Sequence, residues 1–103
     1  MTEREKFRIA ETKEFVFARD SYQCGTCGRS IYHYGTPQMA HRIAATEANI
    51  KKYGKEVIHH PGNLVSACCL RCNDAQNIGN RPEEADALAE TIRAAIRQES
   101  LAV

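Results

Sequence analysis

Hydrophobic residues recur at helical spacing near both ends of the chain. Residues 5–20 contain neither Gly nor Pro, and their periodic apolar positions predict one amphipathic helix. Those positions are Phe7, Ala10, Phe15 and Ala18. Near the other end, Pro82 precedes apolar residues at helical intervals, which predicts a second helix over residues 82–100. The chain therefore begins and ends with helices, and residues 21–79 form the middle.

The middle of the chain is divided by Gly and Pro into short segments. Residues 31–34 and 38–43 are extended segments on either side of the turn signal at residues 35–37, so we expect them to pair as a β-hairpin. Simple alternation then places Met39, His41 and Ile43 on the face that looks inward. Gln38 and Arg42 would look outward.

Three shorter signals follow the expected hairpin. Thr46 is a suitable N-cap for a helix over residues 47–53 that stops at Gly54. Residues 61–63 read Pro-Gly-Asn, which predicts a turn before the chain re-enters the core. Residues 73–79 can form about two helical turns before a Gly stop.

Length and composition indicate one small domain that needs covalent cross-links or a bound metal ion for stability. The 103 residues have 43% hydrophobic content and no Trp, which leaves a modest core. Five Cys is an odd number, and the charged first eight residues show no secretion signal, so we expect a reducing, cytoplasmic location. No run approaches the ~18 to 20 apolar residues of a membrane span, so we expect no membrane association.

The net charge of +1 does not indicate strong sequence-independent binding to nucleic acid. Its distribution is uneven: residues 1–81 carry 12 basic against 8 acidic groups, and residues 82–103 carry 2 against 5. A basic region before an acidic helix is compatible with a surface that faces phosphates. Ordinary solvated charges explain this uneven distribution equally well.

The cysteines carry the strongest chemical signal. Cys24 and Cys27 form one close pair, and a second group of Cys68, Cys69 and Cys72 follows about 40 residues later. Two such loops supply the four thiolates of a tetrahedral zinc site. Spacing alone favours Cys69 with Cys72 as the second pair, because two intervening residues is the usual arrangement. Free structural thiols or a redox pair are the alternatives, and no βαβ context supports the redox reading.

The order of motifs resembles the zinc-bearing form of the HNH endonuclease family over roughly residues 15–79. The resemblance lies in Arg-Asp-Ser-Tyr-Gln-Cys-Gly-Thr-Cys at residues 19–27, Ala-His-Arg-Ile at 40–43, Asn-Leu-Val-Ser-Ala-Cys at 63–68 and Cys-Asn at 72–73. It implies an α+β fold with a small ββα-metal core at residues 21–79, flanked by the two helices within one domain, residues 1–103. It also implies that Cys68, five residues after Asn63, is the third zinc ligand with Cys72, in place of Cys69.

The same resemblance assigns catalytic roles. His41 matches the general base, Asn63 the residue that fixes the loop and orients the base, and Asn73 a ligand of the catalytic divalent metal, Mg²⁺ or Mn²⁺. A neutral imidazole can accept a proton from water at pH 7. Without the motif, His41 would be read as a core histidine and Asn63 as a turn residue.

One position departs from the family pattern: Ala40 stands where an acidic metal ligand is usual. His60 is the first candidate to replace that ligand, then Gln38, and Asn77 could assist from the same helix face as Asn73. Water could also fill the position, because Mg²⁺ keeps waters readily. His59 and His33 are assigned to the surface or to phosphate contacts.

The sequence therefore predicts a monomeric or weakly dimeric enzyme that nicks DNA. Its candidate DNA contacts are Arg42, Lys51, Lys52 and Arg71, with Lys55 as a further plausible phosphate contact. Each of them is also readable as a solvated charge. The alternative is a non-catalytic zinc module that binds nucleic acid or protein, and Ala40 is its best support.

Overall fold

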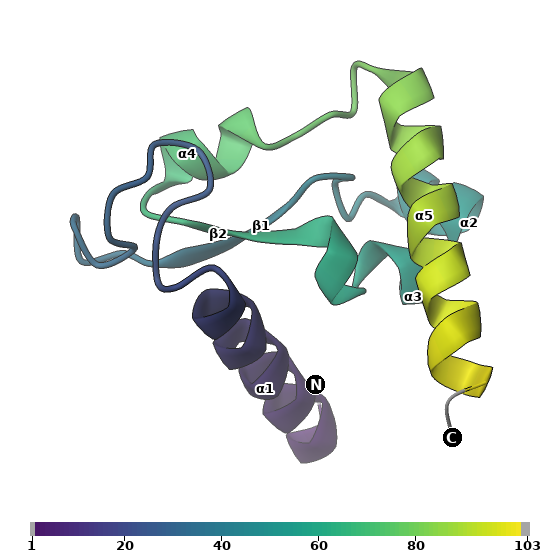
Figure 1. Ribbon diagram of the computed structural model, residues 1–103, viewed down its shortest axis with the longest axis horizontal. Helices are drawn as coiled ribbons and strands as arrows, with labels where there is room; N and C mark the ends of the chain where they lie inside the picture. Colours follow the sequence, from purple (N-terminus) through teal and green to yellow (C-terminus); the bar gives the residue numbers. More distant parts are fainter. Residues whose placement is uncertain (1, 102–103) are drawn as a thin grey trace.

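Two antiparallel strands form the centre of the molecule, with helices on both sides (Figure 1). The structure is a computed structural model that describes residues 2–101. Its elements are α1 (Glu3–Arg19), β1 (Gln38–His41), α2 (Glu47–Tyr53), α3 (Lys55–Ile58), the 3-10 helix η1 (Pro61–Asn63), β2 (Leu64–Ala67), α4 (Leu70–Ala75) and α5 (Pro82–Leu101). In Figure 1, α4 lies above the strands and α1 below them, while α5 stands beside α2 and α3. The fold is a small α+β arrangement, as the sequence predicts.

The partner of β1 differs from the sequence prediction. β1 pairs with β2, with Gln38 opposite Ala67 and His41 opposite Leu64, and not with residues 31–34. Residues 31–34 form turns instead, closed by a hydrogen bond from the Gly35 N–H to the Tyr32 carbonyl at 2.9 Å. Only one side chain of that segment is buried, whereas β2 buries three of its four, so β2 gives β1 more apolar contact.

The buried face of β1 is also the reverse of the expected one. Ala40 is fully buried against the cysteine loops, whereas Met39 and His41 are half-buried on the opposite face. Ile43, the third residue expected on the inward face, is buried, but it lies beyond the end of β1 in a different core. An alanine at position 40 leaves room for the cysteine side chains that pack there.

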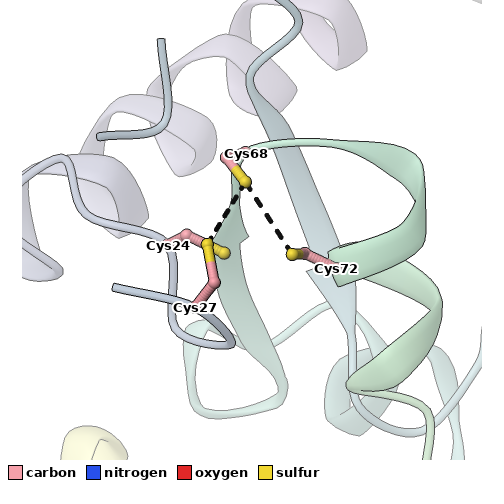
Figure 2. Close-up of side chains that lie close together, drawn as sticks. All are labelled: Cys24, Cys27, Cys68 and Cys72. Atoms are coloured by element: carbon pink, nitrogen blue, oxygen red, sulfur yellow. Dashed lines mark hydrogen bonds between the residues drawn. The ribbon is translucent and has the colours of Figure 1, made fainter. Parts of the chain in front are cut away.

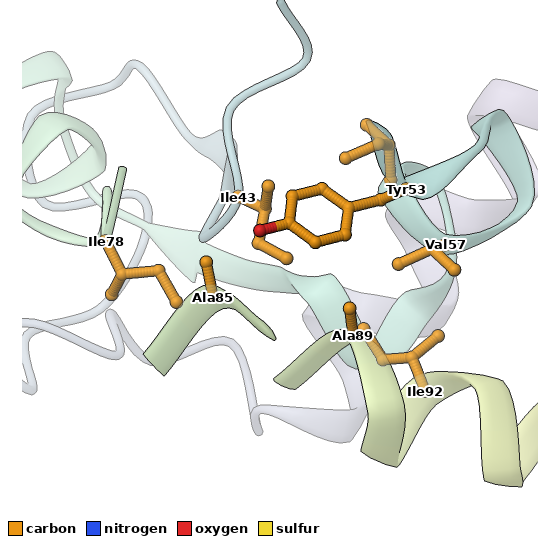
Figure 3. Close-up of a cluster of buried hydrophobic side chains, with 8 residues drawn as sticks. Ile43, Tyr53, Val57, Ile78, Ala85, Ala89 and Ile92 are labelled. Atoms are coloured by element: carbon orange, nitrogen blue, oxygen red, sulfur yellow. The ribbon is translucent and has the colours of Figure 1, made fainter. Parts of the chain in front are cut away.

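The largest apolar core lies between α2, α3 and α5 (Figure 3). Its buried members are Ile43, Tyr53, Val57, Ile58, Ile78, Ala85, Ala89 and Ile92. The two predicted helices here are confirmed: the Thr46 hydroxyl accepts a hydrogen bond from the Asn49 N–H at 3.1 Å, and α5 begins at Pro82. The predicted helix at residues 73–79 instead begins at Leu70 and ends at Ala75.

The N-terminal helix packs through its last turn. Val16 and Phe17 are buried, while Phe7 and Phe15, two positions of the predicted stripe, are exposed. The Arg19 guanidinium donates to the Leu64 carbonyl at 2.6 Å, and the Asp20 carboxylate accepts from the Ser66 N–H at 2.9 Å. Polar contacts to β2 therefore hold the end of α1.

No helix within residues 2–101 is long and apolar enough to cross a membrane.

Asn63 ties three separate segments together inside the protein. Its side chain is fully buried, and its Oδ1 accepts from the Ile43 N–H at 2.8 Å. Its Nδ2 donates to the carbonyls of Ile43, at 3.0 Å, and Ile58, at 2.8 Å. One amide thus satisfies backbone groups that enter the core and have no water available.

We expect Asn63→Ala to lower the free energy of unfolding by about 3 kcal/mol, because it leaves buried backbone groups of Ile43 and Ile58 without partners. Denaturant unfolding measures the change. Asn77→Ala is the matched control, since the exposed Asn77 side chain bonds only to the Gly79 N–H, and it should cost less than about 1 kcal/mol. Equal losses in the two variants would contradict the role of Asn63.

Candidate functional site

Four cysteine sulfurs converge beside the strands (Figure 2). The Sγ atoms of Cys24, Cys27, Cys68 and Cys72 all lie within 4.8 Å of one another. Cys68 Sγ is 3.5 Å from Cys27 Sγ and 3.8 Å from Cys72 Sγ. Four Zn–S bonds of ~2.3 Å at tetrahedral angles place sulfurs about 3.8 Å apart. The donor set and its spacing are therefore consistent with a structural zinc site, and the group contains Cys68, not Cys69.

Local contacts shape the first cysteine loop and join it to the second. The Thr26 N–H lies 3.4 Å from Cys24 Sγ, and the Thr26 hydroxyl donates to the Cys72 carbonyl at 2.9 Å. The Gly25 N–H donates to the Ser66 carbonyl of β2 at 2.9 Å. A Cβ at position 25 would lie 2.4 Å from Val65 Cγ1, so only glycine allows this close approach.

The cysteines differ in their readiness to ionise. Burial opposes ionisation of Cys24, but hydrogen bonds from the backbone N–H groups of Cys27, Thr26 and Cys68 outweigh it and lower its pKa to about 6. Burial and the neighbouring Cys27 thiol raise the pKa of Cys68 above its ordinary value. Metal binding would therefore displace a proton from Cys68, as ligand thiols require.

An open cleft of about 870 Å³ lies on the other face of β1, between α1 and α5. His41, His59 and His60 line it, together with Ile9 from α1 and Ile96 from α5. Burial lowers the pKa of His41, and repulsion from His59 lowers it further. The His41 imidazole is therefore neutral at pH 7, as a proton acceptor must be.

His41 and His59 meet across this cleft. His41 Nε2 lies 3.4 Å from His59 Nδ1, and the rings are nearly perpendicular, with an angle of 82° between their planes. His41 is fixed as the last residue of β1, whereas His59 is exposed at the end of α3. The sequence analysis assigns His59 to the surface or to phosphate contacts, and does not pair it with His41. No sequence signal could find this pair, because it depends on how α3 folds back toward β1.

The three residues assigned by the HNH resemblance do not share one site. Asn63 is buried behind His41, and its backbone carbonyl accepts from the Arg42 N–H at 2.9 Å. It can therefore help to position His41 through the backbone. Asn73 lies on α4, where its Nδ2 donates to Gln38 Oε1 at 2.8 Å, and it does not line the cleft that holds His41.

The other candidate ligands of a catalytic metal are engaged elsewhere. His60 Nδ1 accepts from the Gly62 N–H at 2.9 Å, and Nε2 lies 3.0 Å from a carboxylate oxygen of Glu99. Asn77 lies beyond the end of α4, not on a shared helix face with Asn73, and accepts from the Gly79 N–H. Among residues 2–101, the four cysteines are the only group of three or more His, Cys, Asp or Glu placed to hold an ion. The expected ligands therefore do not fit a preformed Mg²⁺ or Mn²⁺ site.

Of the predicted DNA contacts, Lys55 lines the cleft and the other four lie outside it. Lys52 pairs with Asp86 at 3.3 Å and lies over the Tyr53 ring. Lys51 and Arg71 are exposed on α2 and α4, and Arg42 is half-buried. The basic residues that do line the cleft are Arg8 and Lys55. Arg8 could not be selected from the sequence, because α1 reaches the cleft only through the tertiary fold.

Comparison with known proteins gives no independent identification. No family model matches the chain, and neither a curated protein nor a solved structure shows significant similarity to it. The function must therefore be argued from the cysteine cluster and the cleft.

We expect Cys68→Ser to weaken zinc binding at least ~10- to 100-fold and to lower the melting temperature, because it removes one of the four converging sulfurs. Cys69→Ser is the matched control from the neighbouring position, and its stability should stay within about 0.5 kcal/mol of wild type. Zinc content after dialysis and thermal melting measure both effects. The opposite pattern would show that Cys69 supplies the ligand.

Proposed function

We propose that the protein is a DNA endonuclease that nicks one strand at each active site. The observation that carries the proposal is the position of His41: a half-buried imidazole with a lowered pKa, at the end of β1, in an open cleft. The order β1, β2 and α4, with α4 packed on both strands, supports the ββα reading. The cysteine cluster beside these elements supports the zinc-bearing form.

His41 would act as the general base. Its imidazole accepts a proton from water as the water oxygen bonds to phosphorus and the bond from phosphorus to the 3′ oxygen breaks. The departing oxygen takes a proton from solvent, and His41 returns its own to solvent. Burial keeps His41 unprotonated between cycles. Asn63 holds the backbone just after His41 and so fixes the orientation of the ring.

The divalent cation that the resemblance implies is not part of this mechanism. Asn73, His60 and Asn77 do not converge, and Ala40 supplies no ligand. The nicking assay, run with Mg²⁺, with Mn²⁺ and with a chelator, measures whether the activity depends on either ion.

The basic residues of the cleft support a phosphate-bearing substrate. Arg8 and Lys55 line it together with His41, which gives a phosphodiester two cationic partners. Only one such imidazole base is available per chain, so a monomer addresses one strand. Cutting both strands would require two chains or two successive events.

A second candidate function is a non-catalytic zinc module that binds nucleic acid or protein. Apart from the four cysteines, residues 2–101 contain no group of three or more His, Cys, Asp or Glu placed to hold a cation, which favours this candidate. The exposed phenylalanines Phe7 and Phe15 on α1 also suit a binding role.

We expect His41→Ala to reduce plasmid nicking by at least the ~10² to 10⁴ typical of a general base, because proton transfer is lost while the fold is kept. A supercoiled plasmid assay with Mg²⁺ or Mn²⁺ measures the rate. Wild-type activity should rise with pH as His41 loses its proton, with a midpoint below the ordinary 6.5 since its pKa is lowered.

The control variant is His33→Ala, which removes an exposed histidine of the turn segment outside the cleft and should nick at the wild-type rate. Unchanged zinc content and melting temperature would show that His41→Ala remains folded. If His41→Ala nicks as fast as wild type, the nuclease proposal fails and the binding module becomes the better account.

A further inference from the structure

The contact between His41 and His59 is long for a hydrogen bond. The two facing nitrogens are 3.4 Å apart, whereas N–H···O hydrogen bonds span about 2.7 to 3.2 Å. Two Zn–N bonds of ~2.05 Å at a tetrahedral angle place the nitrogens about 3.3 Å apart. The separation therefore suits two ligands of one ion as well as it suits a long hydrogen bond between the rings.

We propose that His41 Nε2 and His59 Nδ1 bind one divalent transition-metal ion, zinc, cobalt or nickel, at a site separate from the four cysteines. Imidazole nitrogens suit these ions, whereas Mg²⁺ prefers oxygen ligands. The ring centroids are 5.6 Å apart, farther than the nitrogens, so both nitrogens lie between the rings. Because His59 is exposed, its ring has room to turn so that both lone pairs reach one ion.

The surroundings make this ion exchangeable. No third His, Cys, Asp or Glu within residues 2–101 is in place beside the pair, so water or an anionic group fills the remaining positions. Glu5 and Glu56 line the same cleft as Arg8 and Lys55, so the charged groups of the lining balance and the ion depends on the two imidazoles. The ion therefore binds more weakly than one held by four thiolates.

A regulatory consequence rests on the proposed function. The ion would bind His41 through Nε2, on the same imidazole that the proposed function uses to accept a proton from water. An ion bound at the pair occupies that lone pair, so micromolar zinc should inhibit nicking while Mg²⁺ does not.

Zinc stoichiometry tests the site independently of any activity. Tag-free chain is dialysed against buffers of fixed free zinc, and zinc per chain is measured by atomic absorption. Wild type should reach two zinc ions per chain, and His59→Ala only one, with affinity at the second site at least ~10- to 100-fold weaker. His33→Ala, which removes a histidine outside the cleft, should still reach two.

The site is overturned if wild type stops at one ion, or if His59→Ala binds the second ion as tightly as wild type. These results do not depend on whether the protein is a nuclease. In the nicking assay, His59→Ala should need at least tenfold more zinc than wild type for half-inhibition. Equal sensitivity in an active His59→Ala would overturn the regulatory consequence alone.

Discussion

The convergence of four cysteine sulfurs is the constraint on which the rest of the structure depends. It joins the loop that follows α1 to Cys68, directly after β2, and to Cys72 on α4, about 40 residues farther along the chain. The small side chains of Ala40 and Ala67 fill the space beside the sulfurs and allow β1 and β2 to lie against them. Because an apolar core of this size contributes limited free energy, a metal ion at the sulfurs would supply much of what holds these elements together.

The cleft depends on a second constraint, the buried amide of Asn63. The cysteine cluster fixes one face of β1, and Asn63 fixes the chain where it leaves the strand, through Ile43. His41 lies between these two fixed points and points to the opposite face from Ala40. A side chain held in this way keeps one orientation while its ring remains accessible from the cleft. This is the property that both a proton acceptor and a metal ligand require.

Sequence signals within a few neighbouring residues were sufficient to predict the elements that depend only on those residues. Pro82 and the helical spacing after it located α5, and Thr46 located the start of α2. The cysteine pairs indicated the metal site, and the motif order selected Cys68 over the closer spacing of Cys69. The hairpin was wrong because turn residues beside a strand do not reveal that a distant segment offers a better apolar partner. The pairing of His41 with His59 also depends on tertiary packing, so no periodic pattern in the sequence predicts it.

X-ray absorption at the zinc edge tests the central claim most directly, on protein loaded with one equivalent of zinc. At one equivalent, the stronger site is filled and any weaker one stays largely empty. The account predicts four sulfur neighbours at ~2.3 Å and no nitrogen or oxygen in the first shell. A first shell containing nitrogen or oxygen, or fewer than four sulfurs, would contradict the claim that the four cysteines form the staple of this fold.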